Sequence, residues 1–163
     1  MADYVVEPSP AIAGRLRVPG DKSISHRAVM FGAIASGTTH VTGFLEGEDC
    51  LSTMKAVAKL GVSVHRPGPG EVRVEGAGLR GLRAPDSVLD MGNAGTAMRL
   101  FMGLMAAQPF DTELVGDASL MRRPMERVAK PLRTMGATIE TQDGRPPVRI
   151  RGGAALRGIH YEM

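Results

Sequence analysis

The stretch Gly20-Asp21-Lys22-Ser23-Ile24-Ser25-His26-Arg27 decides the fold, together with its echo, Gly92-Asn93-Ala94-Gly95-Thr96-Ala97-Met98-Arg99. Each opens with a glycine turn and continues into an almost wholly apolar run, for which we expect a helix. The two stretches keep one spacing, because Gly20 lies 72 positions before Gly92 and Arg27 lies 72 before Arg99. Two helix N-termini built alike, with cations beside them, indicate a site that holds anions.

Outward from these stretches, the pattern of apolar residues and turns repeats. The first unit is expected to contain a helix capped by Ser23 or Asp21, a strand, a second helix and a hairpin, at 23–36, 38–45, 49–60, and 62–65 with 72–75. The second unit is expected to contain the same order at 96–107, 112–115, 124–135 (with a kink or break at Pro131), and 137–141 with 148–151. Short strands are also expected at 4–6 and 16–18. The sequence therefore predicts an α/β fold made of two repeated units, about 20–83 and 84–158.

The repeat also predicts that a further unit exists. Units of this kind seldom bury their apolar faces alone, and here both first helices are apolar nearly all round. The stretch 158–163 matches the passage that follows Leu82, where the first unit runs into the second. We therefore expect the chain to be the N-terminal part of a longer protein.

Composition excludes several classes of protein. Hydrophobic residues make up 43% of the 163 residues, which favours a folded chain over a disordered one. The net charge of +3 is spread along the chain and aromatic residues are only 4%, so a nucleic-acid surface is not expected. A single cysteine, no signal peptide and no membrane-spanning run favour the cytoplasm. The four histidines show no metal-binding spacing.

The placement of charge is the strongest argument for an anion site. Asp and Glu are favoured at a helix N-terminus, and the helix near Asp49 follows that rule. The helix that begins near Lys22 has cations there instead, and Arg123 directly precedes the helix near Pro124. Backbone N–H groups with Lys and Arg are what a phosphate or carboxylate requires. The spacing does not fit a P-loop.

Three stretches resemble signature segments of the 5-enolpyruvylshikimate-3-phosphate synthase family: 20–28, 92–99 and 117–125. The resemblance runs along the whole chain. It implies the enolpyruvyl transferase fold (an inside-out α/β barrel), with two domains of three βαβαββ units each. Residues 1–19 would then be strands of the second domain, and 20–163 would hold two of the three units of the first. Leu100 stands where many members have proline, which resembles the family's second, less glyphosate-sensitive class.

The resemblance also implies an activity and a set of site residues. Members transfer the enolpyruvyl group of phosphoenolpyruvate to the 5-hydroxyl of shikimate 3-phosphate and release phosphate, in the shikimate pathway of aromatic amino acid and chorismate biosynthesis. They use no cofactor and no metal. Shikimate 3-phosphate would be held by Lys22, Ser23 and Arg27, and phosphoenolpyruvate by Lys22, Asn93, Gly95, Thr96 and Arg123. The acid and base residues would lie outside this chain, which is expected to be inactive alone.

Two alternatives stay open. One is the related enolpyruvyl transferase of UDP-N-acetylglucosamine, which uses a loop cysteine, whereas Cys50 is expected on a helix. The other is a non-catalytic anion-binding fragment. The full enzyme is expected to be a monomer, and this chain is expected to self-associate or to complement its missing C-terminal part.

Overall fold

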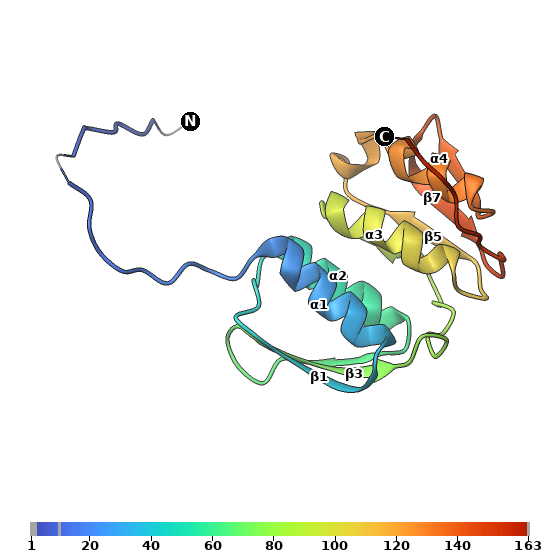
Figure 1. Cartoon of the computed structure of the whole chain (residues 1–163), viewed down its shortest axis with the longest axis horizontal. Coiled ribbons are helices and arrows are strands. Elements are labelled where there is room, and N and C mark those ends of the chain that lie inside the picture. The colour runs from blue at the N-terminus through green and yellow to red at the C-terminus, as the bar shows by residue number, and fades with distance from the viewer. Residues whose placement is uncertain (1–2, 10, 163) are drawn as a thin grey trace.

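The computed structural model describes residues 3–9 and 11–162. Its helices and strands form two neighbouring groups, and an extended N-terminal segment leads away from them (Figure 1). Each group places its helices on one face of a sheet. Alternation along β3 and β7 buries one side of the strand and exposes the other, as expected when a sheet has a single covered face.

The first group follows the expected order of helix, strand, helix and hairpin. Its elements are α1 (Lys22–Ile34), β1 (Ser36–Thr42), α2 (Glu48–Lys59), β2 (Ser63–His65) and β3 (Glu71–Ala77). The strands lie in the order β1-β3-β2 and both pairings are antiparallel.

The second group repeats that order with two additions. Its elements are β4 (Leu89–Asp90), α3 (Gly95–Ala106), β5 (Thr112–Val115), η1 (Leu120–Arg122), α4 (Glu126–Thr134), β6 (Thr138–Gln142) and β7 (Arg145–Arg151). The strands lie in the order β4-β5-β7-β6, with β4 parallel to β5. The short 3-10 helix η1 was not expected from the sequence.

Asp21, rather than Ser23, caps α1. Its side-chain Oδ1 accepts a hydrogen bond from the Ile24 amide at 2.7 Å, which satisfies one of the free N–H groups of the first turn. Ser23 lies inside the helix. At the other end, α1 stops at Ile34, two residues before the expected limit, because Ser36 already pairs with Ala77 in the sheet.

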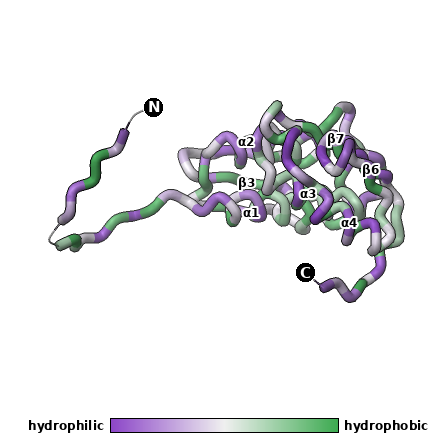
Figure 2. Tube along the Cα trace, turned by 90° about the horizontal axis from the view of Figure 1, so that it is seen from above, coloured by the Kyte–Doolittle hydropathy of each residue, from purple (hydrophilic) through white to green (hydrophobic). Residues whose placement is uncertain are grey.

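The strands expected at 4–6 and 16–18 are absent from the described residues. Those segments are exposed and pair with no strand, and Figures 1 and 2 both show the segment standing clear of the rest. A strand needs a partner for its backbone N–H and C=O groups, and none of the described segments lies beside these residues. Within the 1–19 domain assignment, residues 1, 2 and 10 lie outside the description.

Of the kink or break expected at Pro131, the break does not occur. Helix α4 begins at Glu126, later than expected, and continues through Pro131 to Thr134. Proline removes one N–H donor, yet the Pro131 carbonyl still accepts a hydrogen bond from the Met135 amide at 2.9 Å.

Helix α3 supplies the centre of the core. Phe101 is fully buried, and so are one alanine and three methionines of the same helix: Ala97, Met98, Met102 and Met105. The turn before α1 is held close to the end of β1, because a Cβ atom on Gly20 would lie 1.8 Å from the carbonyl oxygen of Gly43. No residue with a side chain fits there. This close approach fixes where the first turn of α1 begins.

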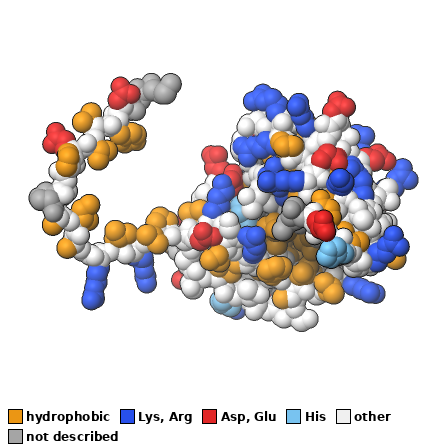
Figure 3. Space-filling view, turned by 45° about the horizontal axis from the view of Figure 1, so that its top comes forward, with side chains coloured by type: hydrophobic (Ala, Val, Ile, Leu, Met, Phe, Trp, Pro, Cys, Tyr) orange, Lys and Arg blue, Asp and Glu red, His pale blue; other side chains and the backbone are white. Residues whose placement is uncertain are grey.

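One apolar side of α1 remains open. Ile24 and Phe31 are 68% and 64% exposed, although the helix is apolar nearly all round. Phe31 lines a groove of about 210 Å³ between α1 and α3, together with Arg27, Met30, Ile34, Leu100, Gly103 and Leu104. Figure 3 shows hydrophobic side chains gathered on the face that carries this groove. None of the described helices has the length and apolar content needed to cross a bilayer.

Candidate functional site

The first turn of α1 presents three of the expected site residues to solvent. Lys22, Ser23 and Arg27 are all exposed, and the turn contains no acidic residue. Arg27 donates through Nη1 to the Ser23 carbonyl at 3.0 Å, so its guanidinium folds back over the helix N-terminus. The positive end of the helix and two cations therefore lie together, as an anion site requires.

Lys22 has a partner that was not expected from the sequence. Its ammonium forms an ion pair with Oδ2 of Asp49, in the first turn of α2. Lys22 remains half exposed, at 52%. An exposed pair of this kind contributes little to stability, so an arriving anion can compete with Asp49 for the ammonium.

The start of α3 brings together Asn93, Gly95 and Arg123. The Arg123 guanidinium donates to Oδ1 of Asn93, whose amide in turn donates to Oδ2 of Asp117 at 2.7 Å. Oδ1 of Asp117 also accepts from the amide of Leu120, the first residue of η1, at 2.7 Å. These hydrogen bonds and the nearby Arg123 charge lower the pKa of Asp117. The acid thus orients Asn93 and joins η1 to the loop before α3.

Arg99 is a fourth member of this cluster that was not among the expected residues. A Cβ atom on Gly95 would lie 3.1 Å from Nη1 of Arg99 and 3.1 Å from Nη1 of Arg123. Two guanidiniums therefore crowd the first residue of α3, and only glycine leaves that space free. The 72-position relation to Arg27 was the available signal in the sequence. Thr96 is the next residue of α3 and its side chain is exposed.

Three guanidiniums lie near the start of α3, and Asp117 reaches Arg123 only through Asn93. Burial lowers the pKa of Arg99, and the charges of Arg127 and Arg123 lower it further. In the described part of the chain, none of these three guanidiniums forms an ion pair with a carboxylate. The first turn of α3 also has no acidic residue. The arrangement is suited to a small anion such as a phosphate or carboxylate.

Helix α2 connects the two helix starts. Asp49 reaches Lys22 at α1, while Ser52 faces the loop before α3, since a Cβ atom on Gly92 would lie 3.0 Å from the Ser52 hydroxyl. Cys50, between them, is fully buried, and burial raises the pKa of its thiol. The thiol is therefore neither on a loop nor available as a nucleophile.

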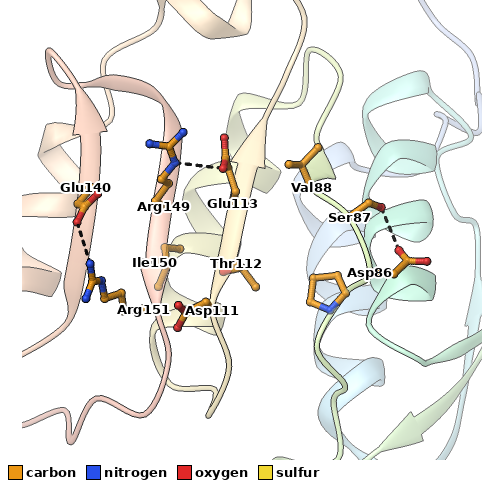
Figure 4. A pocket seen from close by; sticks show the side chains of 11 residues that line it. Asp86, Ser87, Val88, Asp111, Thr112, Glu113, Glu140, Arg149, Ile150 and Arg151 are labelled. Atoms are coloured by element: carbon orange, nitrogen blue, oxygen red, sulfur yellow. Dashed lines mark hydrogen bonds and ion pairs between the residues drawn. The ribbon is translucent and has the colours of Figure 1, made fainter.

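A hollow larger than the groove between α1 and α3 lies elsewhere. A depression of about 410 Å³ opens on the uncovered face of the second sheet, at the ends of β5 and β7 (Figure 4). Its arginines are already paired across strands, Arg149 with Glu113 and Arg151 with Glu140. Asp86 and Asp111 add negative charge. None of the expected site residues lines it, and its charge does not suit an anion.

Comparison with known proteins agrees with the resemblance seen in the signature segments. A family model described as EPSP synthase (3-phosphoshikimate 1-carboxyvinyltransferase) matches residues 6–163. The chain is 57% identical to the 3-phosphoshikimate 1-carboxyvinyltransferase of Alkalilimnicola ehrlichii over 162 residues, and 51% identical to that of Legionella pneumophila over 163. These matches cover 99% and 100% of this chain but only 36% and 38% of the relatives.

A solved structure shares the fold. An EPSP synthase from Acinetobacter baumannii superimposes with a TM-score of 0.88 at 61% identity, covering 91% of this chain and 34% of that one. The expected fold class, α/β of the enolpyruvyl transferase type, is thereby confirmed. The match of the family model to nearly the whole chain shows that the chain belongs to the EPSP synthase family.

Proposed function

We propose that this chain supplies part of the substrate site for transfer of the enolpyruvyl group from phosphoenolpyruvate to the 5-hydroxyl of shikimate 3-phosphate, with release of phosphate. The observation that carries the proposal is that the first turns of α1 and α3 contain no acidic residue and have cations beside them. Both substrates are small anions with a phosphate group, and shikimate 3-phosphate and phosphoenolpyruvate each also carry a carboxylate.

In this proposal each of the two helix starts binds one substrate. Lys22, Ser23 and Arg27 bind shikimate 3-phosphate, and Asn93, Gly95, Thr96 and Arg123 bind phosphoenolpyruvate, with Lys22 reaching both. The exposure of the α1 residues and the Arg123–Asn93 contact support this division. The acid and base residues belong to the part of the full-length enzyme that this chain does not match.

The domain assignment forms part of the same proposal. Units 20–83 and 84–158 make two thirds of one domain, and 1–19 provides strands to a second. The uncovered groove between α1 and α3 is then filled by a third unit in a longer protein, which acts as a monomer in the cytoplasm. Without that unit the groove drives self-association of this chain. Light scattering at rising concentration tests this, and a monomer at all concentrations would refute it.

The test of the function has two stages. Shikimate 3-phosphate is first titrated into the chain, and into a Lys22→Ala variant. Loss of one charge-assisted contact costs about 1.5–3 kcal/mol, so the variant is expected to bind roughly ten-fold or more weakly. Equal affinity in the two proteins would contradict the assignment of Lys22.

The second stage measures phosphate release from shikimate 3-phosphate plus phosphoenolpyruvate. The chain is assayed alone and then mixed with the C-terminal part of the Alkalilimnicola ehrlichii relative that this chain does not match. We expect no turnover alone and turnover on mixing. Turnover by the chain alone would show that its own residues complete the chemistry. Binding without turnover on mixing would favour the alternative, a non-catalytic anion-binding protein.

The UDP-N-acetylglucosamine transferase alternative receives less support, because the one cysteine is buried in α2 rather than on a loop.

A further inference from the structure

Two polar contacts, one helical turn apart, join α1 to α2. Lys22 pairs with Asp49, and four residues further along both helices Nδ1 of His26 lies 2.7 Å from Oγ1 of Thr53. Residues four apart lie on the same face of a helix, so the two helices run side by side in the same direction and in register. The first contact is partly exposed, whereas His26 and Thr53 are both fully buried.

The His26–Thr53 contact continues to the backbone of α2, because the Thr53 hydroxyl also lies 3.3 Å from the Asp49 carbonyl oxygen. Either atom of the His26–Thr53 pair can donate, according to the imidazole tautomer. In both tautomers Nε2 of His26 is buried without a partner among the described residues. Leaving a buried polar atom unpaired costs free energy, so packing alone does not explain the choice of histidine.

The second unit shows that the fold does not require this polar pair. The repeat spacing of 72 between first helices and 75 between second helices places Met98 and Val128 where the first unit has His26 and Thr53. Met98 is fully buried and Val128 packs against the core. The second unit therefore has apolar side chains in α3 and α4 at the positions that correspond to His26 and Thr53.

The polar pair lies one turn below the candidate anion site. His26 follows Lys22 by one turn and directly precedes Arg27, while Thr53 belongs to the turn of α2 that also faces the loop before α3. A hydrogen bond has a narrow range of lengths and angles, and apolar contacts tolerate sliding. The polar pair can thus hold a register that the apolar pair would not.

We propose that His26 is a positioning residue: its hydrogen bond to Thr53 sets the register of the first turns of α1 against α2, and so places Lys22, Ser23 and Arg27 for shikimate 3-phosphate. The ligand in this statement rests on the proposed function. The register itself does not, which allows the two to be tested separately.

The central variant is the double substitution His26→Met with Thr53→Val, which copies the pair found in the second unit. Replacing both partners with apolar groups of similar size leaves no unpaired donor, so the melting temperature should stay within a few degrees. Thr53→Ser retains the hydroxyl and is the matched control. Amide hydrogen exchange of residues 23–27 and titration with shikimate 3-phosphate are measured in all three proteins.

We expect faster exchange at 23–27 and roughly ten-fold weaker binding in the double variant, and values near those of the parent chain with Thr53→Ser. Unchanged exchange in a folded double variant would overturn the inference. If the parent chain binds no shikimate 3-phosphate, the proposed function fails, while exchange still decides the register.

Discussion

The sharpest prediction concerns Gly95, the first residue of α3, where alanine should weaken phosphoenolpyruvate binding without harming the fold. The added Cβ atom would lie 3.1 Å from one guanidinium nitrogen of Arg99 and 3.1 Å from one of Arg123. Ordinary contact begins near 3.4 Å, so both guanidiniums must retreat by a few tenths of an ångström. They are the ends of flexible side chains, and the helix itself has no need to move.

The magnitude follows from the contacts that the retreat removes. Losing one charge-assisted hydrogen bond to the anion costs about 1.5–3 kcal/mol, which is roughly a 10- to 150-fold loss of affinity. The assay is calorimetric titration of phosphoenolpyruvate into the parent chain and the variant. Thermal melting is recorded on the same samples, and the melting temperature is expected to change by less than about 3 °C.

Gly103→Ala provides the matched control, because it makes the same chemical change in the same helix. A Cβ atom there meets nothing within 4 Å, and alanine is favoured over glycine inside a helix by about 0.5–1 kcal/mol. Its melting temperature should rise by up to about 4 °C, and its affinity should match that of the parent chain. If Gly95→Ala binds phosphoenolpyruvate as tightly as Gly103→Ala does, the reasoning about the two guanidiniums is refuted.

Three further predictions concern the core, pH and the thiol. Phe101→Ala should lower the free energy of unfolding by about 3–5 kcal/mol in urea titration, whereas the exposed Phe31→Ala should change it by about 0.5 kcal/mol or less; similar losses would contradict the burial. Burial lowers the pKa of His26, Asp49 on α2 opposes this, and Lys22 and Arg27 on α1 add to it. As the pH falls, His26 takes up a proton near its ordinary pKa of 6.5 in the unfolded chain, and only at lower pH in the folded chain. The contribution of neutral His26 to stability is therefore complete above pH 6.5 and is lost as the pH falls below it. Urea midpoints measured from about pH 7.5 to about pH 5 should fall more steeply in the parent chain than in the His26→Met, Thr53→Val variant, and equal slopes would argue against a buried neutral imidazole. Cys50 should react with a chromogenic thiol reagent only after denaturant is added, and fast labelling of the native chain would show that the thiol is accessible.

Much of the fold could be predicted because the signals are local. A glycine turn, a capping residue and an apolar run are neighbours in the chain, so α1 and α3 lie within a few residues of their expected bounds. The exceptions depended on distant groups. Residues 4–6 and 16–18 have the composition of strands but find no partner among the described segments, and α4 continues through Pro131.

The candidate site divides in the same way. The sequence predicts an anion site, because acids are missing from the first turns of α1 and α3 and arginines lie nearby, and this stays a prediction. The partners of those residues could not be predicted. Asp49 meets Lys22 from a position 27 residues away, Thr53 meets His26 across the same interval, and Arg123 approaches Gly95 from beyond η1.

The sequence by itself determined the repeat, the two cationic helix starts and the family, because each depends on residue type and spacing along the chain. Only the tertiary structure decided that α2 runs in register with α1, that Asp117 orients Asn93, and that one apolar side of α1 stays uncovered. The physical reason is that a hydrogen bond acts over about 3 Å, and the residues that come this close are selected by how the helices pack rather than by their order in the chain.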